Sequence, residues 1–175
     1  MILENFSPTR SQQKFFDYFP LQLNPPNPVD HRCIELHGDI GCGTSTCAAI
    51  WLLLQSYWYP ERKGLIFCKE FILSDFMVTV NLWENYLENY LKSNWHSADC
   101  DKSLLTGDRF DYIVVDQAGY LSAKDFDSID RELSDRGQIL VTVGSEKSDD
   151  FFQWSVKTRS LVIDINFGEN SWDIE

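Results

Sequence analysis

The chain has 175 residues, of which 43% are hydrophobic and 14% aromatic, so it is long enough to bury a substantial core within one domain. Its formal net charge of -12 argues against a broad nucleic-acid-binding surface, because such surfaces draw most of their affinity from Lys and Arg. A local basic patch stays possible, although the adjacent basic pair Arg62-Lys63 is preceded by Glu61.

The N-terminal part of the chain predicts a helix followed by a stiff connector. Residues 7–19 open with Ser-Pro-Thr and continue as RSQQKFFDYF, which predicts a helix with an N-cap at its start. The segment Asn24-Pro25-Pro26-Asn27-Pro28 breaks regular structure and leads into the first core strand. We therefore expect residues 1–28 to form an N-terminal helix and connector, ahead of a main domain at residues 29–166.

A glycine-rich segment lies between a predicted strand and a predicted helix. Residues 32–36 read as a short buried strand, and residues 45–55 carry apolar side chains at helical spacing. Between them, Gly38, Gly41 and Gly43 can adopt backbone angles that other residues avoid, and they leave room for a phosphate to approach the amides. A strand, a glycine-rich turn and a helix N-terminus together form an anion site from N–H groups and the helix dipole.

This segment has the layout of a phosphate-binding P-loop, G-x-x-x-x-G-K-[ST], with one departure. Thr44 stands where a lysine would bridge the outer phosphates, whereas Ser45 keeps the position of the hydroxyl that binds magnesium. The ionisable groups of the loop are His37 and Asp39, and Asp39 would repel a phosphate. The candidate phosphate-binding residues are Gly38, Gly41, Gly43, Thr44, Ser45 and Thr46. The alternative is a strand-to-helix turn that binds nothing.

The middle of the chain predicts a strand, a long helix and a loop. Residues 64–68 form the strand, and residues 71–94 the longest helical candidate, in which Phe76 and Trp83 are spaced by seven. We expect this aromatic stripe to be a core face, with a groove for a partner as the alternative. Residues 97–109 are polar and are predicted to form a loop.

A second motif follows at residues 111–118, where the apolar run DYIVVDQA ends in an acid. This is the form of a Walker B strand, whose Asp, here Asp116, holds magnesium through water. In many ATPases with a Walker B strand, the residue after this Asp is a Glu that activates the attacking water. This chain has Gln117, which can orient a water but cannot accept its proton. Both Thr44 and Gln117 therefore replace charged groups that normally supply chemistry.

The last third of the chain continues the alternation of helices and strands. The predicted elements are a helix at residues 122–134, a strand at 138–143, a helix at 149–157 and a strand at 161–165. Arg136-Gly137 is expected to end the first of these helices, and Thr142 and Ser145 lie at the rim of the following strand. Such alternation predicts the α/β class, with a parallel β-sheet sandwiched by helices and any ligand at the carboxyl ends of the strands.

Together these motifs resemble the ATPase domain of nucleic-acid motors, namely viral large terminase subunits and superfamily 1 and 2 helicases. The likeness rests on Gln12 or Gln13 ahead of the loop, the loop at residues 38–46, the strand end at 116–118 and the strand end at 142–145. The separation between the loop and the second motif suits this group better than compact replication-initiator helicases. The resemblance implies the P-loop NTPase (RecA-like) fold.

In that family the early Gln contacts adenine, the loop holds the phosphates, and the later polar strand end couples hydrolysis to movement. The resemblance thus implies ATP and magnesium as ligands, although the altered motifs leave open that the protein binds neither. The residues that it implies are Gln12 or Gln13 for the base, Ser45 and Asp116 for magnesium, and Gln117 and Thr142 for catalysis if the protein is active.

Three functions stay open from the sequence. The first is a pseudo-ATPase, a degenerate P-loop domain with no or very weak NTP hydrolysis that serves as a binding or assembly module in a nucleic-acid-processing complex, for example a viral one. The second is the ATPase subunit of a DNA-packaging or helicase motor whose site is completed in trans. The third is an acidic interaction protein or nucleic-acid mimic.

The same patterns bear on partners and location. We expect a protein partner or a homo-oligomer, nucleic acid only through a local patch or a partner, and no membrane contact, since the longest apolar run, residues 47–54, is too short to cross a bilayer. The five cysteines show no C-x-x-C pairing and no secretory signal is recognisable, which favours free thiols in a cytoplasmic or intracellular protein, in the host cell if viral. The acidic residues 167–175 are expected to form a solvated tail, or else a docking peptide.

Overall fold

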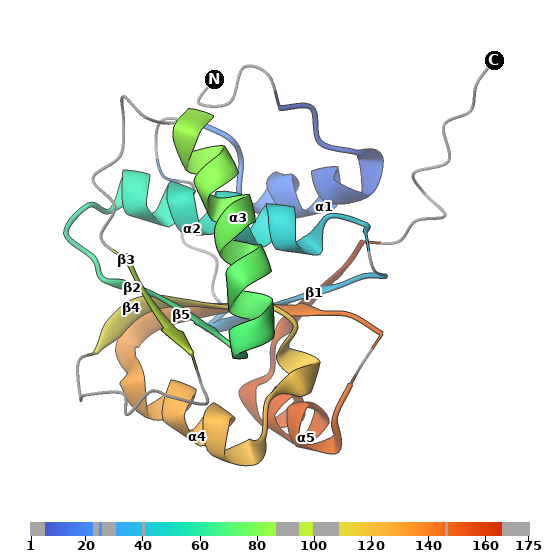
Figure 1. Ribbon diagram of the computed structural model, residues 1–175, viewed down its shortest axis with the longest axis vertical. Helices are drawn as coiled ribbons and strands as arrows, with labels where there is room; N and C mark the ends of the chain where they lie inside the picture. Colours follow the sequence, from blue (N-terminus) through green and yellow to red (C-terminus); the bar gives the residue numbers. More distant parts are fainter. Residues whose placement is uncertain are drawn as a thin grey trace.

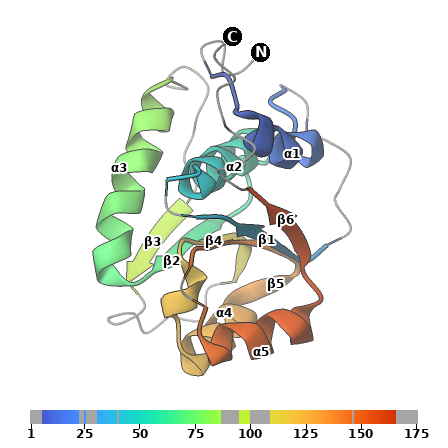
Figure 2. The ribbon, with the colours of Figure 1, turned by 90° about the vertical axis from the view of Figure 1, so that its right-hand side faces the viewer.

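The computed structural model describes residues 6–22, 25, 31–39, 41–86, 95–99, 109–145 and 147–165. Its centre is a six-stranded sheet with the strand order β3-β2-β4-β5-β1-β6, and every neighbouring pair is parallel. Helices α1, α2 and α3 cover one face of the sheet, and α4 and α5 cover the other (Figures 1 and 2). The predicted α/β class with a parallel sheet sandwiched by helices is confirmed.

Helices and strands alternate along most of the chain, as the sequence predicted. They are α1 Arg10–Tyr18, β1 Cys33–His37, α2 Thr44–Trp58, β2 Gly64–Cys68, α3 Glu70–Tyr86, β3 Trp95–Asp99, β4 Phe110–Val115, η1 Ala118–Tyr120, α4 Ala123–Glu132, β5 Leu133–Val143, α5 Asp149–Thr158 and β6 Leu161–Asp164. Among the described residues, every helix is too short or too polar to span a bilayer.

Two hydrophobic cores lie on opposite faces of the sheet. On one face, aromatic side chains of α1, among them Phe15 and Phe19, pack with Trp51 of α2. On the other, Phe126 of α4 stacks on Trp154 of α5 with ring centroids 4.7 Å apart. Because both faces are covered, the inner strands are apolar on both sides, which is why they appear in the sequence as continuous apolar runs.

One predicted loop is instead a strand. Residues 95–99 form β3, which pairs in parallel with β2, so the prediction of a loop from residue 97 onward is wrong at its start. The polar sequence of this segment is typical of a loop, but within the described sheet β3 is an edge strand, with a neighbouring strand on one side only. Edge strands tolerate polar side chains that central strands do not.

The junction between α4 and β5 also differs from the prediction. The helix ends at Glu132, and β5 already begins at Leu133 and continues through Arg136 and Gly137. Leu133 pairs with Phe110 and Gln138 with Tyr112, so the intervening residues form a bulge in the strand. Gly137 resembles a helix C-terminus in the sequence, but in the structure it lies in the part of β5 whose pairing with β4 is irregular.

Several expectations fall on residues outside those described. These are the connector at residues 24–28 except for Pro25, the end of the long predicted helix at residues 87–94, and the acidic tail at residues 167–175. The N-terminal helix, Arg10–Tyr18, lies within the predicted residues 7–19, and Thr9 of the Ser-Pro-Thr segment is its N-cap. The boundaries proposed for the main domain stay a prediction.

Gly64 offers a test of how tightly β2 and β4 are packed. A Cβ at Gly64 would overlap the ring of Tyr112, which is buried and whose hydroxyl lies 2.8 Å from the Ser56 hydroxyl. Because the ring is held at both ends, we expect Gly64→Ala to lower the free energy of unfolding by about 1–3 kcal/mol, the usual cost of overpacking a core. Equilibrium urea denaturation measures this difference.

The matched control is Gly144→Ala, because a Cβ there meets no atom within 4 Å. We expect this variant to unfold within about 0.5 kcal/mol of the natural chain, as surface substitutions usually do. Equal losses at the two positions would show that the clash with Tyr112 is not the cause.

Candidate functional site

A cavity of about 360 Å³ opens at the carboxyl ends of the central strands β1, β4 and β5. Parallel strands bring these ends to one edge of the sheet, and in open α/β sheets ligands bind at this edge. The residues that line the cavity are Gly38, Asp39, Gly41, Gly43, Thr44, Ser45, Thr46, Gln117, Tyr120, Thr142, Gly144 and Ser145. All six predicted phosphate-binding residues and both predicted catalytic residues are among them.

The loop between β1 and α2 has the backbone that its glycines predict. Gly41 and Gly43 have φ angles of 86° and 90°, a region that L side chains rarely adopt. Gly43 is the N-cap residue of α2 and places no side chain over the first turn of the helix. Amides of a helix N-terminus that no side chain caps, together with the helix dipole, favour an anion at this point.

Gln12 packs against this loop, whereas Gln13 does not. A Cβ on Gly43 would overlap the amide nitrogen of Gln12, so the two residues are in close contact. The carbonyl of the Gln12 side chain accepts a hydrogen bond from the Thr9 N–H at 2.9 Å, which completes the capping box of α1. Gln13 is exposed and binds Asp17 at 3.0 Å. Neither glutamine is among the described residues that line the cavity, and their proposed contact with a base stays a prediction.

Three side chains from three elements meet beneath the loop. The hydroxyl of Ser45, in the first turn of α2, donates to the two carboxylate oxygens of Asp116 at 2.9 and 3.1 Å. The hydroxyl of Thr142, near the end of β5, donates to the same carboxylate at 2.6 Å. Asp116 itself directly follows β4. The fold thus joins the two motifs that the sequence predicted to share one site.

Burial raises the pKa of the Asp116 carboxyl above its ordinary value, although hydrogen bonds from Thr142 and Ser45 oppose this effect. The side chain is almost completely inaccessible, and its backbone N–H points to the Cys68 sulfur at 3.4 Å. Acids whose pKa is shifted by burial and by specific partners are frequent at functional sites, and Asp116 is such an acid.

Gln117 has an unusual backbone conformation for its residue type. Its φ of 55° and ψ of 58° lie in the left-handed region, and its N–H donates to the Thr142 hydroxyl at 2.8 Å. Thr142 therefore accepts from Gln117 while it donates to Asp116. This turn leaves the Gln117 side chain exposed and in the lining of the cavity.

The described lining of the cavity contains a single charged side chain, and it is the acid Asp39. Thr44 lines the cavity at the position of the usual lysine and adds no positive charge. A site of this polarity needs a cation before it can hold a polyphosphate tightly.

The side chains beneath the loop fit magnesium. They are two hydroxyls and one carboxylate, and Mg²⁺ in nucleotide sites takes oxygen ligands from one or two protein side chains, from substrate phosphates and from water. Among the described residues there is no group of three or more His, Cys, Asp or Glu side chains that could hold a metal. Binding of magnesium here would therefore depend on phosphate oxygens.

Tyr120 and Gly144 also line the cavity, although the sequence did not predict them as site residues. Tyr120 is in the short helix η1, and its ring contacts Phe71 of α3 edge-on at 5.5 Å. An aromatic residue four positions after the acid was the available signal. Cys42 and Cys47 flank the end of the loop, and burial raises the pKa of both thiols, so they are not activated nucleophiles.

The sequence matches no protein-family model and no curated protein, but the fold has clear likenesses. The large terminase of a thermophilic bacteriophage superposes with a TM-score of 0.72 at 10% identity over 94% of this chain, and it has also been solved with ATP-gamma-S. The HK97 bacteriophage large terminase gives 0.61 at 11% identity over 88% of this chain. Domain III of the Thermotoga maritima replication initiation protein DnaA gives 0.51 at 14% identity over 91%.

These likenesses confirm the P-loop NTPase (RecA-like) α/β fold. The chain covers 47% of the thermophilic phage terminase, 43% of the HK97 terminase and 63% of the DnaA domain, so each of those chains extends beyond the shared fold. The resemblance to viral terminase ATPase domains that the sequence suggested is therefore present in the structure. Identities this low show the fold alone.

The raised pKa of Asp116 gives a stability prediction. Because the folded state binds the proton of this acid more tightly than the unfolded chain does, the ionised carboxylate lowers the stability of the fold at pH 7. We expect Asp116→Asn to raise the free energy of unfolding at pH 7 by on the order of 1 kcal/mol. The difference should shrink as the pH falls through the raised pKa, because Asp116 is then neutral as well. Urea denaturation over a range of pH measures it.

Asp39→Asn is the control for this experiment, since Asp39 is an exposed acid of the same cavity. We expect it to leave stability within about 0.5 kcal/mol at each pH. A clear loss of stability in Asp116→Asn at pH 7 would instead mean that the hydrogen bonds of the ionised carboxylate outweigh its burial.

Proposed function

We propose that this P-loop domain binds a magnesium–nucleoside triphosphate at residues 38–46, hydrolyses it very slowly or not at all, and acts as a binding or assembly module in a nucleic-acid-processing complex. The observation that carries the proposal is the contact of Ser45 and Thr142 with the buried Asp116 beneath the glycine-rich loop. A turn with no ligand would not need to keep a carboxylate at such a cost in solvation.

The loop and its surroundings supply most of what a nucleotide requires. The backbone around Gly41 and Gly43 and the first turn of α2 offer N–H donors to phosphate oxygens. In this proposal the Ser45 hydroxyl would bind magnesium directly and Asp116 would bind it through water, and the hydrogen bond between the two side chains supports a shared role. When bound, magnesium would neutralise charge on the phosphates. The complex of the thermophilic phage terminase with ATP-gamma-S supports a nucleotide as the ligand of this fold.

The groups that normally accelerate hydrolysis are replaced in this chain. Thr44 cannot place a positive charge on the phosphates, and Gln117 can orient a water but cannot take its proton. A single electrostatic or acid–base contribution is worth about 10²–10⁴-fold in rate. The loss of both should leave nucleotide binding as the main activity, which suits a module whose conformation or assembly depends on the bound nucleotide.

The proposal predicts binding without turnover. We expect calorimetry to detect ATP binding that requires magnesium and that Ser45→Ala weakens by about tenfold, because one hydrogen bond to a charged group is lost. Steady-state hydrolysis should stay near background. The double variant Thr44→Lys with Gln117→Glu should raise it by at least about 100-fold, since it restores both missing charges.

Two results would contradict this function. One is the absence of magnesium-dependent nucleotide binding by the natural chain. The other is a hydrolysis rate well above background that Ser45→Ala abolishes, because it would show a working enzyme rather than a pseudo-ATPase.

A second candidate is an ATPase whose site is completed by a neighbouring subunit. An exposed apolar surface beside the cavity favours it. Phe71 is 62% exposed and contacts Tyr120, and Val78 and Leu82 are exposed along the same helix, α3. Because Tyr120 also lines the cavity, a subunit that covers this surface could bring an Arg or Lys to the phosphates.

Completion in trans predicts that hydrolysis depends on assembly. The rate per chain should rise with protein concentration, in parallel with oligomer formation in analytical ultracentrifugation, and Phe71→Glu should abolish both. The matched control is Phe152→Glu, because Phe152 is 66% exposed on α5, which covers the other face of the sheet. A rate per chain that is independent of concentration, or a chain that stays monomeric and inactive at all concentrations, would contradict this candidate.

A further inference from the structure

The middle of β1 contains a buried acid that the proposed nucleotide site does not use. Glu35 is 1% exposed, and β1 lies between β5 and β6 in the sheet. Inner strands of a parallel sheet covered on both faces are usually apolar, and a buried carboxylate is costly unless it is paired. Glu35 therefore calls for a physical explanation.

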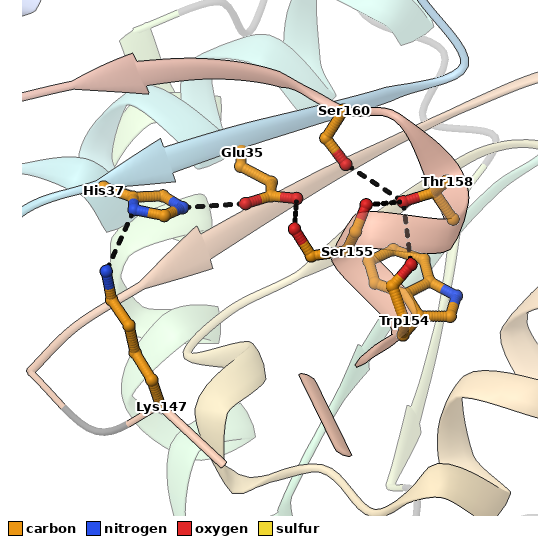
Figure 3. A network of polar contacts seen from close by, with 7 residues as sticks. All are labelled: Glu35, His37, Lys147, Trp154, Ser155, Thr158 and Ser160. Carbon is orange, nitrogen blue, oxygen red and sulfur yellow. Dashed lines mark hydrogen bonds and ion pairs between the residues drawn. The ribbon is translucent and has the colours of Figure 1, made fainter. Parts of the chain in front are cut away.

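Glu35 is the centre of a line of polar contacts that joins α5, β1 and the segment after β5 (Figure 3). One carboxylate oxygen accepts a hydrogen bond from the Ser155 hydroxyl of α5 at 2.6 Å. The other lies 2.8 Å from Nε2 of His37, two residues further along the same face of β1. Nδ1 of His37 in turn lies 3.2 Å from the Lys147 ammonium. The line thus runs from α5 through β1 to the segment after β5.

The direction of each hydrogen bond follows from the charge of Glu35. Burial raises the pKa of this carboxyl, but the hydrogen bonds from His37, Ser155 and Ser160 outweigh burial and hold the pKa below its ordinary value. An ionised carboxylate accepts only, so Nε2 of His37 donates to it, and in the neutral imidazole Nδ1 then keeps its lone pair. That lone pair can accept from the ammonium of Lys147. Glu35 therefore selects the histidine tautomer that binds a cation.

The position of Lys147 relates it to the cavity. His37 directly precedes Gly38, and Lys147 is two residues after Ser145, and both Gly38 and Ser145 line the cavity. The ammonium is thus held beside His37, the residue that precedes the loop, although Lys147 is not itself among the described residues that line the cavity. Among the described residues, its one recorded polar partner is His37, which leaves two of its three N–H donors for a ligand. By contrast Lys69, which follows β2 at the same edge of the sheet, contacts Asp125 at 3.4 Å.

We propose that Lys147 supplies, for nucleotide binding, the positive charge that Thr44 lacks, by contacting the terminal phosphates, and that His37 and Glu35 are positioning residues that hold its ammonium beside the loop. Lys147 does not replace the missing acid at Gln117, so hydrolysis stays slow. This inference rests on the proposed nucleotide-binding function. A lysine has a flexible four-carbon stem and acts on phosphate as a point charge. Its ammonium can therefore bind a phosphate from the end of another strand as well as from the loop itself.

A purely structural role for the same contacts is a distinct possibility to be tested. Ser155 and Glu35 tie α5 to β1, and their loss would destabilise the fold whatever Lys147 does. Lys147, however, is exposed, so its side chain adds little to folding. Substitution of Lys147 therefore separates phosphate binding from stability, and it is the variant on which the test depends.

The experiment is calorimetric titration of the full chain with ATP and with ADP in the presence of magnesium. We expect Lys147→Met to weaken ATP binding by about tenfold or more, because a charged hydrogen bond is lost, and to weaken ADP binding less. Lys147→Arg should keep most of the affinity. The control Lys157→Met removes an exposed lysine in the last turn of α5 and should change neither affinity.

Two further variants test the replacement and the positioning. Thr44→Lys in the Lys147→Met background should restore ATP affinity, because the charge returns at its usual place in the loop. Glu35→Gln should weaken ATP binding in the natural chain but not in the Lys147→Met background, since its effect passes through the ammonium. Urea denaturation of each variant shows whether the fold is intact.

The outcomes separate this inference from the proposed function. Natural protein that binds no nucleotide overturns both. Natural protein that binds ATP with magnesium, while Lys147→Met binds it equally well, overturns the inference alone. If Glu35→Gln lowers ATP affinity equally in both backgrounds, the contacts of Glu35 are structural and its positioning role is overturned.

Discussion

The buried carboxylate of Asp116 is the constraint on which the site depends. It lies where β4 ends, and it is held by hydroxyls from Ser45 at the start of α2 and Thr142 near the end of β5. One group thereby fixes the start of the loop helix relative to two neighbouring strands. The cost of burial is visible in its raised pKa. Sites that keep such a group trade stability for a prepared ligand position.

A second buried acid, Glu35, lies in β1, the strand that precedes the loop, and it is also held by hydrogen bonds. Asp116 accepts hydrogen bonds from two hydroxyls and is the proposed ligand of magnesium, whereas Glu35 accepts from a hydroxyl and contacts the His37 imidazole, which in turn contacts the Lys147 ammonium. Glu35 belongs to an inner strand and Asp116 directly follows one, and buried polar groups at such places are satisfied by partners rather than by water. Asp116 thus binds the first turn of α2, which follows the glycine-rich loop, and Glu35 contacts His37, which precedes the loop and holds the Lys147 ammonium.

The sequence predicted those elements that have a strong local pattern. The predictions were wrong where an element depends on pairing with a strand that is distant in the sequence. The strand at residues 64–68 was predicted within its observed bounds, because its apolar run has clear limits. β3 was taken for a loop because a polar edge strand has no local signature. The early start of β5 at Leu133 was missed because it depends on pairing with Phe110, which is distant in sequence.

The sequence by itself determined the parallel α/β fold, the glycine-rich loop and the uncharged side chains of Thr44 and Gln117 in the two motifs, because these follow from residue type and short-range periodicity. The tertiary structure alone decided that Ser45, Asp116 and Thr142 share one hydrogen-bonded cluster, that Gln12 rather than Gln13 packs on the loop, and that Lys147 lies beside His37. The last pair is separated by 110 positions. Strand order, which brings β5 beside β1, sets such contacts, and no local pattern encodes it.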